Sequence, residues 1–447
     1  MVASPCLRTY RFEAHGGQVC LHLRIADSGT GTLFVDAQDA VHLSETAAEM
    51  ALFALEAVPP AEAVRTLKAR FRGVRPHLLR RDYDQVAQVV RHLSTPRPGC
   101  STCGLDLEQS PLFSTRPDAP YRADLALTYR CNNNCTHCYN EEQRRSKQSL
   151  SVADWRRVLE RLHRAGVPHL VFTGGEPTLF EGLPELVAHA SRQGQLVGMN
   201  TNGRRLADPA ILSALVSAGL NHVQTTLEAA DARTHNAMVR ADAFDETDQG
   251  LRNALTAGLH ALTNTTLTQA NAASATAVVE YVHGLGVRTF AMNGMIHSGR
   301  GASHPDALRP EELAPILVNV RERARELGMR FLWYTPTRYC ALSPLELDLG
   351  PKRCTAAEYA VCVEPDGGVL PCQSWYEPVG NLLRDEWEAL WNSPLFRAFR
   401  DRTATPRAFG LPHDCVDCPD LTVCAGGCPL ETVCAPRTAC SPRPHCG

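Results

Sequence analysis

Three cysteines lie close together in the stretch YRCNNNCTHCYN, at Cys131, Cys135 and Cys138. Thiols at this density form either disulfides or metal sites, and the redox compartment decides between them. The sequence has no basic start followed by an apolar run and no apolar stretch of about 18 residues, so we expect neither a secretory signal nor a membrane span. We therefore expect a cytoplasmic protein in a reducing compartment, where clustered cysteines favour metal binding.

The spacing of the triplet indicates which kind of metal site this is. Structural zinc sites need four ligands, commonly two CxxC pairs far apart, whereas the local set here is CxxxCxxC. Three thiolates on a four-iron cluster leave one iron without a protein ligand, and that iron can coordinate a substrate. The small polar residues Asn132, Asn133 and Asn134 let the loop wrap such a cluster. The alternatives are a zinc knuckle or buried structural thiols.

Cysteine is also concentrated at the other end of the chain. Eleven of the 18 cysteines fall from Cys340 onward. The spacing CxxCxxxxxCxxxC runs through Cys415, Cys418, Cys424 and Cys428. This clustering predicts further metal sites in the C-terminal part.

The elements that position the triplet are predicted from hydrophobic patterning. Residues 121–336 alternate six times between an apolar strand pattern and a helical pattern, from ADLALTY to VRTFAMNG. Such repeats favour an α/β fold with parallel strands covered by helices, either open or closed into a barrel. Chemistry in these folds sits in loops at the carboxyl ends of strands, and the three-cysteine loop follows the first strand.

Three further regions flank this core. Residues 1–95 combine a hairpin around Gly16-Gly17, a third strand TLFVD and three helices, as in a winged helix-turn-helix. Residues 96–120 are rich in proline and glycine and are predicted to be a linker. Residues 337–447 form a loop-rich, cysteine-rich tail.

The triplet after a first strand, together with GGEP after the second, resembles the radical S-adenosylmethionine (SAM) superfamily. The resemblance implies a partial (β/α)6 TIM barrel in which the open iron binds SAM. An electron from the reduced cluster then cleaves the sulfonium to a 5′-deoxyadenosyl radical, which abstracts hydrogen. The implied cofactor contacts are His137 at the adenine, the GGEP residues Gly174, Gly175, Glu176 and Pro177 at the methionine amino group, and Asn202 and Thr226 at the ribose and carboxylate. For Asn202 and Thr226 the alternative is a local polar role in the loop.

The tail resembles the SPASM extension of radical enzymes, which holds two auxiliary four-iron clusters. This likeness implies three clusters in total. The first auxiliary set is Cys354, Cys372 and Cys428, with Cys362 favoured over Cys340 because a hairpin in VEPDGGVLPC would bring it near Cys372. The second set is Cys415, Cys418 and Cys424, with Cys446 favoured over Cys434 or Cys440. The alternatives are a zinc module or a shortened tail with one auxiliary cluster.

The front unit resembles the PqqD-like peptide chaperone of pyrroloquinoline-quinone biosynthesis. In this interpretation TLFVD is an open sheet edge to which a precursor peptide adds as a strand. The alternative is a DNA-binding winged helix, because arginines crowd the region at Arg65, Arg70, Arg72, Arg75, Arg80 and Arg81. The net charge of -3 gives no general reason to expect nucleic acid. We expect a peptide substrate and a reductase such as flavodoxin or ferredoxin, and no membrane partner.

These features together predict a radical SAM/SPASM maturase that abstracts hydrogen from a peptide or protein. The product would be a crosslink, thioether, epimer or oxidised residue. Two alternatives are a radical enzyme acting on a small metabolite or cofactor precursor, and a zinc-stabilised peptide- or DNA-binding protein. Gln373 stands where sulfatase-maturing relatives carry an acidic base, so formylglycine formation is not expected. No catalytic acid or base is assigned, and the roles of Cys100 and Cys103 stay open.

Overall fold

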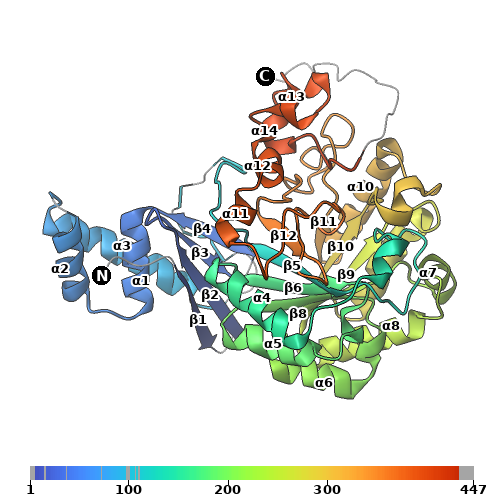
Figure 1. The fold of residues 1–447 in the computed structure, drawn as a ribbon, viewed down its shortest axis with the longest axis horizontal. Helices are drawn as coiled ribbons and strands as arrows, with labels where there is room; N and C mark the ends of the chain where they lie inside the picture. Colours follow the sequence, from blue (N-terminus) through green and yellow to red (C-terminus); the bar gives the residue numbers. More distant parts are fainter. Residues whose placement is uncertain are drawn as a thin grey trace.

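The N-terminal unit is a four-stranded antiparallel sheet covered on one face by three helices (Figure 1). The computed structural model describes residues 6–14, 17–36, 38–71, 73–96, 101–105, 107–108 and 111–431. The strands are β1 (Cys6–Ala14), β2 (Gly17–Ile25), β3 (Gly31–Val35) and β4 (Asp39–Leu43), and the helices are α1 (Glu45–Leu55), α2 (Pro60–Arg70) and α3 (Pro76–Leu93).

The predicted open edge at TLFVD is wrong, because this segment is β3 and pairs with β2 on one side and β4 on the other. The extra strand forms because Val41 and Leu43 point toward the helices, where both pack against the core under α1 and α3. Among the described residues the sheet therefore ends at β1 and β4.

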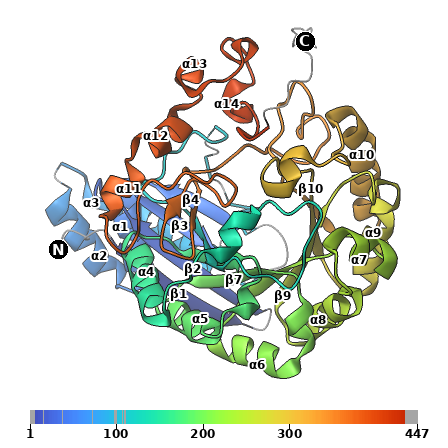
Figure 2. The same cartoon turned by 45° about the vertical axis from the view of Figure 1, so that its right-hand side comes forward.

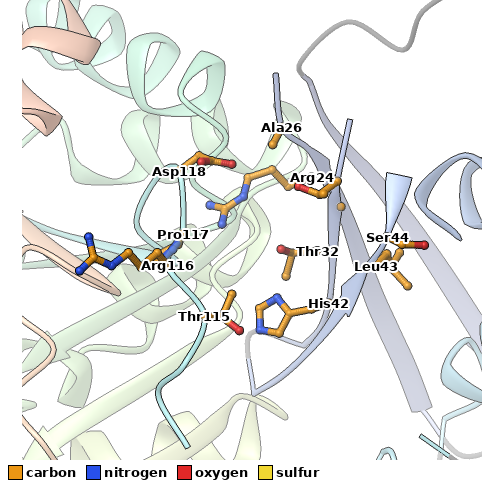
Figure 3. A pocket seen from close by; sticks show the side chains of 12 residues that line it. Arg24, Ala26, Thr32, His42, Leu43, Ser44, Thr115, Arg116, Pro117 and Asp118 are labelled. Atoms are coloured by element: carbon orange, nitrogen blue, oxygen red, sulfur yellow. The ribbon is translucent and has the colours of Figure 1, made fainter. Parts of the chain in front are cut away.

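The second face of this sheet is polar and packs on the core. Arg24 on β2 is only 7% exposed, and its Nη1 donates to the carbonyl oxygens of Ala119, Pro120 and Gly166. Figure 3 shows Arg24 facing segment 115–118 across a small pocket that Thr32 and His42 also line. His22 adds a hydrogen bond from its Nε2 to Gly194 O at 2.8 Å. The N-terminal unit is thus held by buried hydrogen bonds against the parallel-sheet core described next.

The core is a parallel sheet that confirms the six predicted strands and extends beyond them. The predicted strands are β5 (Arg122–Thr128), β6 (His169–Gly174), β7 (Leu196–Thr201), β8 (His222–Thr226), β9 (His260–Thr266) and β10 (Thr289–Asn293). They follow one another in space, and β11 (Arg330–Trp333) continues the sheet in parallel next to β10. This order gives the partial barrel, with its helices on the outside (Figure 2).

Outer helices cover the strands with apolar side chains. They are α4 (Val152–Arg164), α5 (Leu183–Arg192), α6 (Pro209–Ala218), α7 (Ala232–Val239), α8 (Phe244–Thr256), α9 (Ala275–Gly284) and α10 (Pro310–Glu326). In α4, for example, Trp155, Val158, Leu159 and Leu162 are buried at helical spacing against the sheet. This arrangement leaves the carboxyl ends of the strands free to hold a site.

The C-terminal part is built onto the same sheet. Strand β12 (Ala360–Val363) pairs in parallel with β5, and β13 (Val369–Leu370) forms a hairpin with β12. Short helices follow: α11 (Trp387–Trp391), α12 (Pro394–Asp401), α13 (Pro406–Phe409) and α14 (Leu421–Cys424). No helix in the described ranges combines the length and apolar character needed to span a lipid bilayer.

Candidate functional site

The three-cysteine loop follows β5 and is held against α7 by backbone hydrogen bonds. Asn134 N donates to Val239 O at 2.9 Å, and Thr136 N donates to Met238 O at 2.8 Å. Burial raises the pKa of Cys131 to about 11 and raises the pKa of Cys135 well above its usual value; in both cases the neighbouring thiols add to the effect. Thiols in this environment stay protonated unless a positive metal centre binds them, because a metal ligand must be a thiolate.

The two glycines of GGEP let the end of β6 lie directly against the start of the cysteine loop. A Cβ on Gly174 would lie 2.2 Å from Thr128 O, and one on Gly175 would lie 2.3 Å from Arg130 O. Gly174 also has a φ of +129°, a backbone conformation that side chains rarely adopt. Gly175 N donates to Thr128 O at 2.7 Å. The motif is therefore required for the loop to sit over the strand ends.

Glu176 is fully buried and organises the neighbouring loop after β7. Its Oε2 accepts a 2.8 Å bond from Asn202 N, and its Oε1 accepts bonds from Thr178 and from Thr201 Oγ1. Burial raises the pKa of Glu176, and these donors oppose the rise. The Glu176 carboxylate thus accepts hydrogen bonds from within the protein. A cavity lies at the carboxyl ends of the barrel strands, and Gly174 and Gly175 are the GGEP residues that line it. Pro177 begins the short turn Pro177–Leu179.

Asn202 connects this loop to the cysteine loop. Its Nδ2 donates to Asn132 Oδ1 at 2.7 Å and lies 3.9 Å from Cys131 Sγ. Thr226, at the end of β8, lines the same cavity. Both residues therefore lie in the cavity where the sequence places cofactor contacts.

His137 lies over the cavity beside a buried carboxylate. Its Nε2 is 2.9 Å from Glu228 Oε1, and the two side chains are 9% and 0% exposed. Glu228 Oε2 in turn accepts a 2.7 Å bond from Thr266 N. The sequence analysis assigned His137 to the cofactor but gave no partner for its ring, because Glu228 comes from a different strand-end loop. The pairing fixes the imidazole at the cavity wall.

The interior of the barrel is lined mainly by uncharged polar side chains. Asn264 Nδ2 donates to Asn293 Oδ1 at 2.7 Å, linking the ends of β9 and β10. Other lining amides and hydroxyls are Asn140, Asn200, Thr201, Gln224, Thr266 and Gln373. The sequence analysis did not assign these side chains to the cofactor; the signal available was polar residues at alternate positions of a mostly buried strand, such as Asn264 and Thr266 on β9.

The structure brings the first C-terminal cysteine set together. The hairpin aligns Cys362 with Leu370, two positions before Cys372, as the sequence predicted. Burial raises the pKa of Cys372 to about 12, with Cys354 adding to the effect. Burial likewise raises the pKa of Cys428, and the nearby thiols Cys354 and Cys372 contribute. These mutual effects place Cys354, Cys372 and Cys428 in one neighbourhood, with Cys362 adjoining Cys372.

The second set is described only in part. Cys418 N lies 3.3 Å from Cys415 O in a tight turn, and the charge of Cys418 contributes to raising the pKa of buried Cys424. Cys446, Cys434 and Cys440 lie outside the described residues, as does Cys100. The fourth ligand of this set therefore stays a prediction.

No described group of three or more His, Cys, Asp or Glu side chains converges on one point as a single metal ion would need. A four-iron cluster makes a different demand, because its thiolates bind separate irons of a larger body. The spaced thiols of the triplet and of the first C-terminal set, which are half-buried except for the buried Cys362, fit that demand.

Comparison with known proteins identifies the family. The radical SAM superfamily model matches residues 125–269, and the SPASM iron–sulfur cluster-binding domain model matches residues 354–419. The chain is 30% identical over 337 residues to the PqqA peptide cyclase of Streptomyces rochei, covering 74% of this chain and 90% of the relative. It belongs to the radical SAM superfamily.

Two other proteins are similar over most of this chain. The mycofactocin maturase MftC of Mycobacterium tuberculosis is 28% identical over 348 residues, which cover 75% of this chain and 84% of the relative. The crystal structure of Streptococcus suis SuiB bound to its precursor peptide SuiA has the same fold, with a TM-score of 0.68 at 15% identity. That match covers 94% of this chain and 96% of SuiB. The fold likeness therefore includes the front unit.

Membership of the superfamily makes the protein a SAM-dependent enzyme that carries iron–sulfur clusters. The residues present fit these groups: the three half-buried thiols line a cavity whose walls also offer amides, hydroxyls and the His137 ring. Asn202, Thr226 and Gly174, which the resemblance assigns to the cofactor, all line this cavity. When bound, SAM and the cluster supply a carbon-centred radical.

Proposed function

We propose that this protein is a maturase that modifies a ribosomally made precursor peptide. The relatives at 28–30% identity carry this proposal, because their names denote enzymes of peptide maturation and the likeness spans 84–90% of their length. Since the likeness covers most of each relative, it includes both the radical core and the SPASM extension. A similar reaction class on a similar substrate class is the inference it supports best.

The front unit supports a peptide as the substrate. The β4 edge has no partner strand among the described residues, and an extended peptide can add to such an edge through backbone hydrogen bonds. In this assignment residues 1–95 recognise the peptide, 96–120 connect, 121–336 form the radical core and 337–447 form the SPASM domain. Recognition by the backbone needs little sequence from the peptide, so side-chain pockets would add the specificity.

The proposed cluster assignment uses three four-iron clusters. The radical cluster takes Cys131, Cys135 and Cys138. The first auxiliary cluster takes Cys354, Cys362, Cys372 and Cys428, and the second takes Cys415, Cys418 and Cys424 with Cys446. Full ligation of both auxiliary clusters leaves no iron open, which favours electron transfer from the substrate over substrate binding. A flavodoxin or ferredoxin is the proposed source of the reducing electron.

The chain's own side chains then orient the reactants. The Glu176 carboxylate fixes the Asn202 loop, and Glu228 fixes His137, so both cavity walls are preorganised before a cofactor binds. The uncharged amides of Asn264 and Asn293 can bond a peptide's own amide groups without demanding a charged residue. The enclosed walls also limit access of water to a reactive intermediate.

Mass spectrometry tests this proposal. The anaerobically reconstituted protein is incubated with SAM, a reductant and a short peptide encoded beside its gene. We expect a mass change on the peptide together with 5′-deoxyadenosine. If every peptide encoded beside the gene stays unmodified while a small metabolite is converted, the proposed peptide substrate is wrong.

A further inference from the structure

Arginine side chains converge on the three asparagines of the cysteine loop. Arg145 Nη2 and Arg300 Nη1 both donate to Asn134 Oδ1, at 3.0 and 2.7 Å. Arg204 Nη1 donates to Asn132 O at 2.6 Å and to the side-chain oxygen of the next residue at 3.1 Å. The loop that carries Cys131 and Cys135 is therefore clamped by three guanidinium groups.

A fourth arginine extends this cationic region to the exposed surface. Asn134 pairs through its backbone with Val239, and the next residue, Arg240, is exposed and left-handed with a φ of +50°. We call Arg145, Arg204, Arg240 and Arg300 the arginine ring.

The ring carries more positive charge than its own ion pairs neutralise. Arg204 pairs with Glu246, while no ion pair within 4.0 Å joins Arg145, Arg240 or Arg300 to a carboxylate in the described part of the chain. Asp242 is the nearest acidic residue along the chain to Arg240, and it bonds to Asn236 instead. The protein as a whole has a net charge of -3. The ring is thus a local positive patch on a mildly negative molecule.

The patch lies beside the loop that carries the cysteine triplet. Asn134 is exposed and directly precedes Cys135, whereas the cysteines themselves are only partly accessible. Asn134 is bonded directly to Cys135, so a partner seated over this exposed residue would lie close to the triplet. A carrier that seats here would stand next to the site it must reduce.

We propose that the arginine ring docks an acidic one-electron carrier protein over the cysteine loop. This inference rests on the proposed function, since it assumes that the triplet holds the cluster to be reduced. Complementary charge steers a partner to its site and raises the association rate, an effect that weakens with salt. The hydrogen bonds to Asn132–Asn134 leave each guanidinium its positive charge, so the ring both stiffens the loop and attracts the carrier.

The test compares two electron sources on the holoenzyme. The variant Arg240→Glu is compared with the wild type, using a purified bacterial flavodoxin as the probe, and Arg300 is left in place because its side chain holds Asn134 of the cysteine loop. We expect flavodoxin binding by calorimetry to weaken about tenfold and to depend less steeply on salt. Formation of 5′-deoxyadenosine with flavodoxin should slow by a similar factor, whereas the rate with dithionite should stay within about twofold of the wild type.

A matched control keeps the result specific. Arg157 lies on α4 with its side chain 61% exposed, so Arg157→Glu makes a charge change at a distant surface and should leave flavodoxin binding unaltered. Equal flavodoxin affinity in the ring variant and the wild type would overturn the docking proposal. The docking proposal would also be overturned if the ring variant lost duplex DNA binding while its flavodoxin binding stayed unchanged. A wild-type protein that makes no 5′-deoxyadenosine even with dithionite would instead overturn the cluster assignment.

Discussion

Tyr139 and Gln373 join the two cysteine sites through a single hydrogen bond. The Tyr139 hydroxyl donates to Gln373 Oε1 at 3.3 Å, and both side chains line the barrel cavity. Tyr139 directly follows Cys138, and Gln373 directly follows Cys372. A substrate in the cavity would therefore contact a bridge between the proposed radical and auxiliary clusters.

Breaking this bridge should separate cofactor cleavage from product formation. Tyr139→Phe removes the hydroxyl but keeps the ring, so we expect 5′-deoxyadenosine to form at a near-normal rate while modified peptide falls several-fold. The ratio of the two products by liquid chromatography and mass spectrometry measures the effect. Tyr10→Phe, in the front sheet, should leave the ratio unchanged; an unchanged ratio in Tyr139→Phe would show that the bridge has no role.

The cysteine triplet makes the most direct prediction. Alanine at Cys131, Cys135 and Cys138 should abolish 5′-deoxyadenosine formation and lower the iron content of the reconstituted protein. Cys415→Ala should spare cofactor cleavage but stop peptide modification, because it removes a ligand of an auxiliary cluster only. Iron and sulfide analysis beside product assays distinguishes the two, and a triple variant that still makes 5′-deoxyadenosine would contradict the assignment.

Two glycines offer a matched test of the GGEP geometry. Gly175→Ala places a Cβ 2.3 Å from Arg130 O, so the loop must shift, and we expect a loss of about 3 kcal/mol in unfolding free energy or of SAM binding. Gly284, on α9, has nothing within 4 Å of an added Cβ. Gly284→Ala should therefore be neutral or stabilising by up to about 1 kcal/mol. Thermal unfolding and equilibrium SAM binding would show the contrast, and equal behaviour of both variants would contradict it.

Histidines at the junction of the front sheet and the barrel predict acid sensitivity. Burial lowers the pKa of His22 to about 4 and that of His222 to about 4, and lowers the pKa of His169 well below its usual value. His169 and His222 face each other with their Nε2 atoms 3.4 Å apart. These rings are therefore neutral in the folded protein at pH values where the unfolded chain already binds protons.

The sign follows from these directions. The contribution of these neutral histidines to the free energy of unfolding is complete above the unfolded pKa of about 6.5. It is lost as the pH falls from there toward 4, because the unfolded chain then binds protons that the folded protein does not. We expect the unfolding temperature to drop between pH 6.5 and pH 4.5. His22→Gln, which removes one titrating group, should flatten that decline in differential scanning calorimetry. A decline of equal slope in His22→Gln would show that these histidines do not set it.

Some of the fold and site could be read from residue patterns, and some could not. The βα alternation and the placement of GGEP after the second strand were readable because both depend on local periodicity and spacing. Strand β4 was missed because DAVHL is short and gains its order from packing Val41 and Leu43 under distant helices. The pairing of His137 with Glu228 was equally unreadable, since it is created by the closing of the barrel.

Glu176 shows the same limit within a recognised motif. The resemblance assigns it with its neighbours to the cofactor, and this contact stays a prediction; what the sequence did not predict is that its oxygens accept hydrogen bonds from Asn202, Thr178 and Thr201. Spacing indicates that a motif is present but does not say which atoms face inward. That information comes only from the strand register and the course of the loop.

The buried Arg24 anchor has a consequence for the length of peptide that can be a substrate. Because Arg24 and His22 fix the front sheet to the floor of the barrel, the span from the β4 edge to the strand ends opposite is constant. Any peptide gripped at that edge and altered inside the barrel must bridge this constant span. Such a peptide needs a minimum number of residues between its two contact points. We expect peptides with a shorter connecting segment not to be modified, because they cannot contact the β4 edge and the barrel interior at the same time.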